Sequence, residues 1–176
     1  MFLSTLSIEN YRAIKSAELT FNSTTYWVGE NESGKTSLIE AISNLLDADK
    51  GSMPPIFVRS HFHHSEKTKE PVGPIKIKLT FKERKENEWL DESFEPIFHL
   101  FTEENNILRK LELEVKADPV LEGVVQSTWE LRSVESGKKT SDPQILKWIR
   151  EKCPVINLSA GMLTGKGVRN IPLIDP

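Results

Sequence analysis

The sequence predicts an α/β fold in which a mixed or largely antiparallel sheet surrounds one central helix. Segments in which apolar and polar residues alternate outnumber the segments with helical spacing. The clearest helical segment begins at Thr36, and a glycine-rich sequence stands directly before it. A doubly wound fold would instead alternate strands and helices regularly along the chain.

Length and composition indicate one globular domain. The chain has 176 residues, a formal net charge of -3, 38% hydrophobic residues and 28% charged residues, so residues 1–176 suit a single domain that buries a core. No apolar stretch approaches the ~20 residues that span a bilayer, and Ser and Glu interrupt the N-terminal segment where a signal peptide would be apolar. The single cysteine, Cys153, excludes an internal disulfide. We therefore expect a cytoplasmic protein without membrane contact, whose slightly acidic balance gives no overall attraction to nucleic acid.

The first elements along the chain are predicted to be strands. Residues 3–8 and 17–21 alternate apolar and polar side chains, and Asn10-Tyr11-Arg12 interrupts them, so we expect two antiparallel strands with a short connection. A third short strand, Tyr26-Trp27-Val28, leads into Gly29.

The main helix is predicted from Thr36 to Ala48. Its apolar residues recur at helical spacing and form one stripe, at Leu38, Ile39, Ile42, Leu45 and Leu46. Residues 47–74 then contain prolines, glycines and polar side chains, which is typical of a long loop.

Three further strands are predicted in the second half. Residues 75–81 place Lys76, Lys78 and Thr80 on one face and apolar side chains on the other. A solvated sheet face is the simpler interpretation of this alternation, and a nucleic-acid surface is the alternative. Residues 111–117 and 125–131 repeat the alternation around a turn and predict a hairpin.

Two more helices are predicted. Phe94, Ile97, Phe98 and Phe101 have the spacing of a short amphipathic helix. Ser141-Asp142-Pro143 supplies a cap with proline in the first turn for a helix that closes at Lys152. A last strand is predicted at residues 154–158.

One motif carries chemistry. Residues 29–36, Gly-Glu-Asn-Glu-Ser-Gly-Lys-Thr, match G-x-x-x-x-G-K-[ST], the P-loop pattern of P-loop NTPases. In such a loop backbone N–H groups and the start of the next helix bind phosphate oxygens. Lys35 would reach the β- and γ-phosphates, and the Thr36 hydroxyl would bind Mg²⁺. The predicted strand before the motif and the helix after it are the context that the motif requires.

This opening resembles the N-terminal lobe of ABC-type ATPase heads in the RecF/SMC-like group, and within it the overcoming-lysogenization-defect (OLD) family of ATP-dependent nucleases. The matching residues are Asn10-Tyr11-Arg12-Ala13-Ile14, Gly29-Glu30-Asn31 and Gly34-Lys35-Thr36-Ser37-Leu38, with shorter matches at residues 79–83, 88–89 and 153–155. The resemblance implies ATP and Mg²⁺ as ligands and a role in DNA processing, repair or anti-phage defence.

The resemblance also implies a set of nucleotide-binding residues: Arg12, Gly29, Asn31, Ser33, Gly34, Lys35, Thr36 and Ser37, with Thr36 also binding Mg²⁺. Arg12 matches an arginine that lies near the nucleotide, and a surface arginine in a turn is the alternative. Family members often have Asp before Phe in the loop after the first helix, where this chain has His61-Phe62. We interpret His61, His63 and His64 as solvated loop histidines and not as metal ligands, because no cysteine or H-x-x-x-H helix accompanies them.

The parts that would catalyse hydrolysis in such a head are not found in the sequence. ABC-type heads need a strand that ends in Asp-Glu, whereas residues 171–175 contain Pro172 and no Glu follows Asp175. Residues 158–161 match the family's signature loop only by chance, because glycines follow where a helix is required. We therefore expect an incomplete head with no catalytic residue in this chain. Hydrolysis is expected only in the full-length protein or complex, with a homodimeric or complementary head as partner and with DNA bound through other regions.

Two other classes of protein stay open. One is a stand-alone small P-loop phosphotransferase or GTPase, although no N-K-x-D-like guanine reader occurs and the arginines are scattered. The other is a non-enzymatic interaction protein with a vestigial P-loop.

Overall fold

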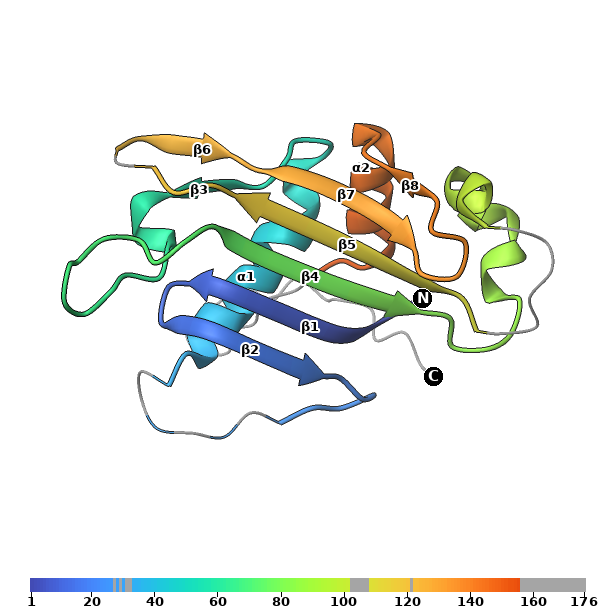
Figure 1. The fold of residues 1–176 in the computed structure, drawn as a ribbon. Helices are drawn as coiled ribbons and strands as arrows, with labels where there is room; N and C mark the ends of the chain where they lie inside the picture. The colour runs from blue at the N-terminus through green and yellow to red at the C-terminus, as the bar shows by residue number, and fades with distance from the viewer. Residues whose placement is uncertain (27, 29, 31–32, 102–107, 121, 156–176) are drawn as a thin grey trace, which may run out of the picture.

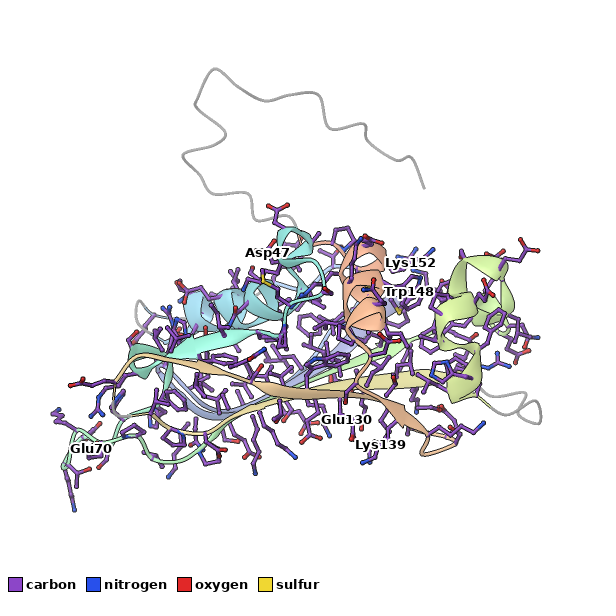
Figure 2. All side chains as sticks on the ribbon, turned by 90° about the horizontal axis from the view of Figure 1, so that it is seen from above. Asp47, Glu70, Glu130, Lys139, Trp148 and Lys152 are labelled. Carbon is purple, nitrogen blue, oxygen red and sulfur yellow. The ribbon has the colours of Figure 1, made fainter. Side chains whose placement is uncertain are left out.

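One antiparallel sheet with helices on a single face organises the molecule. The computed structural model describes residues 1–26, 28, 30, 33–101, 108–120 and 122–155. In this part of the chain a six-stranded sheet has the order β2-β1-β4-β5-β7-β8, with every neighbouring pair antiparallel. Figure 1 shows α1 crossing behind the sheet and α2 beside β7. In Figure 2 both helices lie on the same side of the sheet.

The elements have the following bounds. The six-stranded sheet contains β1 (Phe2–Tyr11), β2 (Ile14–Thr20), β4 (Ile75–Lys82), β5 (Lys110–Ala117), β7 (Thr128–Ser133) and β8 (Lys139–Thr140). A separate two-stranded sheet contains β3 (Ile56–Val58) and β6 (Val124–Gln126). The helices are α1 (Lys35–Leu46) and α2 (Pro143–Lys152), with 3₁₀ segments η1 (Ala48–Lys50), η2 (Arg59–His61), η3 (Glu88–Leu90) and η4 (Glu92–Leu100). No helix of the described residues is long and apolar enough to cross a membrane.

The core lies between the sheet and the two α-helices. Leu79 pairs with Leu6 on one side and with Leu113 on the other, and all three side chains are fully buried. Because side chains alternate between the faces of a strand, this register also buries Ile77 between Ile8 and Val115. The strands predicted at residues 3–8, 17–21, 75–81 and 111–117 are confirmed, but β1 continues through Asn10 and Tyr11, which are predicted to end it. The prediction of a single strand at 125–131 is wrong: the segment is divided at Ser127 into β6, which pairs with β3 in the second sheet, and β7, which pairs with β5 as the hairpin prediction requires.

The outer face of the sheet carries ion pairs between neighbouring strands. Lys76 Nζ lies 3.3 Å from Glu9, and Lys78 Nζ lies 3.6 Å from Glu112, which also pairs with Arg132. The basic residues of the 75–81 strand therefore face carboxylates. This supports the interpretation of a solvated sheet face, because an electrostatic footprint for nucleic acid needs unneutralised basic residues.

The strand predicted at residues 26–28 does not form in the described residues. Tyr26 and Val28 belong to no strand and are 86% and 97% exposed, and Trp27 lies outside the described residues. A strand needs a neighbour for its backbone hydrogen bonds, and none of the described strands pairs with this segment.

Other elements differ from the predictions in detail. The loop predicted at 47–74 contains β3 and two 3₁₀ turns. The helix predicted around Phe94 is the 3₁₀ segment η4, which buries Phe94, Ile97 and Leu100 at a spacing of three and leaves Phe98 38% exposed. Pro96 lies inside it and lacks the N–H that an α-helix requires. The strand predicted at 154–158 is not seen at its first two residues, and residues 156–176, with the 158–161 and 171–175 segments, lie outside the described residues.

The two predicted α-helices are confirmed within two residues of their ends. α2 begins as expected, with Asp142 accepting a hydrogen bond from the Gln144 N–H at 2.9 Å and with proline in the first turn. α1 begins at Lys35 and ends at Leu46.

Candidate functional site

The start of α1 is open to an anion. Gly34 is its N-cap residue, with φ of 91°, and no side chain of the described residues caps the helix. Its first turn contains no acidic residue. The first hydrogen bond within the helix runs from the Leu38 N–H to the Gly34 carbonyl at 3.0 Å. Because the first N–H groups of a helix have no partner inside it, the start of α1 offers positively polarised donors, in contrast to the capped start of α2.

Lys35 turns back over the loop that precedes it. Its Nζ donates to the Glu30 carbonyl at 2.5 Å and to Ser33 Oγ at 3.1 Å. The Ser33 N–H also donates to the Glu30 carbonyl, at 3.3 Å. The Lys35 ammonium group therefore lies between the residues that precede α1 and the first turn of that helix.

The remaining predicted residues of the loop divide by exposure. Thr36 is exposed and can offer its hydroxyl to a ligand. Ser37 is 8% exposed, so its side chain packs inward and its backbone N–H is the group available at the helix start. Gly29 and Asn31 lie outside the described residues.

Arg12 lies in the turn between β1 and β2, and a distant segment holds its backbone. Its φ is 48°. Its N–H donates to the His61 carbonyl at 2.8 Å, and its carbonyl accepts from His63 Nδ1 at 2.7 Å. Since a carbonyl can only accept, His63 carries its proton on Nδ1. The turn is thus positioned by residues that lie beyond α1 in the sequence.

The Arg12 side chain reaches α1. Its Nη1 lies 2.5 Å from a carboxylate oxygen of Glu40, and its guanidinium carbon lies 5.8 Å from the centre of the Tyr11 ring. These residues border a pocket of about 260 Å³ that Ser43, Lys50 and His61 also line. The structure therefore brings Arg12 beside the second turn of the helix whose first turn carries Lys35.

The prediction of solvated histidines is wrong for His61 and His63. The His61 ring lies 5.9 Å from the Tyr11 ring and 6.0 Å from the Phe57 ring, and its Nδ1 accepts from the Val58 N–H at 3.3 Å. Burial, followed by the positive charge of Arg12, lowers the pKa of His61. His63 is bound to the Arg12 carbonyl, as described above. In the described part of the chain no group of three or more His, Cys, Asp or Glu side chains is arranged to hold a metal ion.

Two residues of this region have no signal in the sequence. Glu40 is one of several polar residues on the exposed side of a helix, and its partner Arg12 comes from another element. Arg150 is fully buried and donates from Nε to the Leu45 carbonyl at 2.9 Å, near the end of α1. Spacing rules describe neighbours on one element, so neither contact follows from a pattern.

Most of the chain matches one protein family. Residues 1–159 match the family described as "Protein of unknown function (DUF2813)". The chain belongs to the DUF2813 family. This DUF2813 protein is also 54% identical over 44 residues to the DNA replication and repair protein RecF of Rickettsia massiliae (strain Mtu5), and 52% identical over 44 residues to RecF of Rickettsia conorii. The matched part is 24% of this chain and 12% of those RecF proteins, so the DUF2813 chain matches only a small part of their length.

The fold of the DUF2813 protein is similar to that of a solved structure from work on SMC ATPases. A solved structure, described as "Structural biochemistry of ATP-driven dimerization and DNA stimulated activation of SMC ATPases", has a TM-score of 0.58 and 18% sequence identity to it. The likeness covers 93% of this chain and 89% of that chain. At this identity the likeness concerns the fold alone, which is an antiparallel sheet with the helix α1 on one face.

Proposed function

We propose that this chain is the ATP-binding lobe of an OLD/RecF-like ATPase that acts in DNA processing, repair or anti-phage defence. The observation that carries the proposal is the G-x-x-x-x-G-K-T sequence at the uncapped start of α1, in a fold similar to that of a solved structure from work on SMC ATPases. A P-loop needs both the motif and a helix that presents its free N–H groups to phosphate.

The residues at the start of α1 suit a nucleoside triphosphate. The N–H groups of the first turn would bind phosphate oxygens, and the absence of an acidic side chain in that turn removes a source of repulsion. Lys35 Nζ would exchange the Glu30 carbonyl and Ser33 Oγ for the β- and γ-phosphates. The exposed Thr36 hydroxyl would bind Mg²⁺, whose charge neutralises phosphate oxygens when it is present.

The wider role of the protein is part of the proposal. RecF is a DNA replication and repair protein, and the SMC ATPases of the solved structure are described by ATP-driven dimerization and DNA-stimulated activation. By analogy we propose that two heads associate around ATP and that DNA acts through regions beyond the described residues.

Nucleotide binding by Lys35 is directly testable. Calorimetry with ATP and Mg²⁺ should show binding to the wild type, and Lys35→Ala should weaken it by about ten- to 100-fold, because a charge-assisted hydrogen bond is worth about 1.5–3 kcal/mol. Lys67→Ala is the matched control, since it removes the same charge from an exposed loop residue. Equal ATP affinity for the wild type and Lys35→Ala would contradict the assignment.

The alternative classes separate in a thermal shift assay with ATP, GTP or no nucleotide in the presence of Mg²⁺. A ligand that binds only the folded state raises the unfolding temperature. Stabilisation by ATP supports the proposal, stabilisation by GTP alone favours a GTPase, and no response to either favours a vestigial loop.

A further inference from the structure

Both cations of the proposed nucleotide site are engaged by oxygens of the chain itself. Lys35 donates to the Glu30 carbonyl and to Ser33 Oγ. Arg12 pairs through Nη1 with the carboxylate of Glu40 at 2.5 Å. A phosphate group that binds at the start of α1 therefore has to compete with these oxygens.

The contacts of Lys35 and Arg12 differ in the charge of the oxygen that each cation binds. The oxygens that Lys35 binds are neutral and belong to the loop itself, whereas Glu40 carries a full negative charge. Glu40 lies five residues after Lys35, which is about 7.5 Å along the axis of α1. It is thus close enough to the start of the helix to hold an arginine away from an anion bound there.

The Arg12 side chain can change partners while its backbone stays in place. Its backbone is bound on both sides, to the His61 carbonyl and to His63 Nδ1. Its Nε is buried and has no hydrogen-bond partner among the described residues, and the side chain as a whole is 35% exposed. Rotation about the side-chain bonds is therefore the available motion, and the guanidinium keeps an unused donor.

A nucleoside triphosphate is a stronger partner for Arg12 than Glu40 is. The Arg12 and Glu40 side chains are 35% and 37% exposed, although Oε2 of Glu40, the oxygen next to Arg12, is itself buried, and the carboxylate offers Arg12 a single negative charge. A triphosphate carries several negative charges and can accept from more than one guanidinium N–H. Arg12 would therefore exchange one carboxylate for several phosphate oxygens.

We propose that Glu40 is a built-in competitor for the nucleotide, which neutralises Arg12 in the free site and has to release it when a nucleoside triphosphate binds. This inference rests on the proposed function. It assigns to Glu40 the role of setting nucleotide affinity through Arg12, without contact between Glu40 and the nucleotide.

The test is calorimetric titration of ATP with Mg²⁺ into four forms of the chain: wild type, Glu40→Gln, Arg12→Ala and the double variant. Glu40→Gln should tighten binding by about two- to fivefold, the range expected for the loss of a partly exposed ion pair. Arg12→Ala should weaken binding. In the Arg12→Ala background, Glu40→Gln should have no effect, because the competing pair is already absent.

Two further variants control for side effects. Glu9→Gln makes the same change in net charge and removes the carboxylate that pairs with Lys76 on the outer face of the sheet, so it should leave ATP affinity unchanged. Glu40→Ala repeats the test without an amide oxygen that could still accept from Arg12. Far-ultraviolet circular dichroism confirms that each variant is folded.

Several results would overturn the inference. Weaker binding by Glu40→Gln would mean that Glu40 positions Arg12 for the nucleotide, and unchanged binding would mean that the pair does not compete. Equal tightening in the Arg12→Ala background would indicate simple repulsion between Glu40 and the nucleotide. Failure of the proposed function is a separate result, because Lys35→Ala would then bind ATP as well as the wild type or the wild type would not bind.

Discussion

Gly34 occupies a position that only glycine fits without strain. Its φ of 91° lies in the left-handed region, which costs an L-residue roughly 1–2 kcal/mol. A Cβ built on it would lie 3.3 Å from Cγ1 of Ile14, at the start of β2. The second glycine of the motif therefore serves both the turn into α1 and the close packing of that turn on the sheet.

We expect Gly34→Ala to lower the free energy of unfolding by about 1–2 kcal/mol for the backbone and by a further amount for the displaced Ile14 side chain. Gly123→Ala is the control, because Gly123 has a φ of 84° and a Cβ there would meet nothing within 4 Å. Urea denaturation of the two variants measures the difference. Equal losses would show that the Ile14 contact contributes nothing.

At the scale of elements, Arg150 joins α2 to the end of α1. It is fully buried, and its Nη1 donates to the carbonyls of Gly51 and Met53 at 2.6 and 2.7 Å, while Nε donates to Leu45. The last carbonyls of a helix have no partner within it, so the guanidinium acts as a cap supplied by another helix. Burial lowers the pKa of Arg150, which reflects the cost of keeping this charge inside.

Replacement of Arg150 by methionine should lower the free energy of unfolding by about 2–4 kcal/mol, because it leaves the buried Leu45 carbonyl and the carbonyls of Gly51 and Met53 without this donor. Lys147→Met is the matched control on the exposed side of α2, where it removes only an ion pair with Glu151 and should cost less than about 0.5 kcal/mol. Urea denaturation of both variants provides the measurement. Similar losses for the two would refute the capping role.

At the scale of the whole molecule, the proposed function separates nucleotide binding from nucleotide hydrolysis. In the proposed site Lys35 and Thr36 would bind the phosphates and Mg²⁺ of ATP before reaction. Faster ATP hydrolysis would also require interactions that become stronger in the transition state. The sequence contains no convincing Asp-Glu strand that could position a water molecule for attack.

The side chains of Tyr26 and Val28 are exposed, and no other element of the described residues packs over them.

We therefore expect the isolated chain to bind ATP and to hydrolyse it negligibly. Steady-state phosphate release should equal that of Lys35→Ala, and addition of a polypeptide that carries the Asp-Glu strand and signature loop should raise it. Phosphate release at a rate typical of an enzyme, well above that of Lys35→Ala, would refute this expectation.

The same chain should bind DNA weakly, since its net charge is -3 and the lysines on the outer face of the sheet are paired with carboxylates.

Patterns of neighbouring residues were enough to predict most of the framework. The alternation at 75–81 predicts β4, and Asp142 with Pro143 predicts the start of α2. The glycine–lysine motif predicts an open helix start at Thr36, one residue after the observed start. Each of these depends on backbone geometry and on the period of one element, which act over a few residues. The spacing around Phe94 was less decisive, because three- and four-residue periods overlap in so short a segment.

Contacts between distant residues were decided only by the tertiary structure. The sequence places Arg12 near a nucleotide through a resemblance, but its ion pair with Glu40 exists because the β1–β2 turn packs beside α1. Arg150 caps a carbonyl 105 residues away, and His63 holds a carbonyl 51 residues away. The exposure of Tyr26 and Val28 likewise depends on which strands are present to cover them. Such contacts depend on the simultaneous packing of several elements, and no spacing rule along a single element encodes that packing.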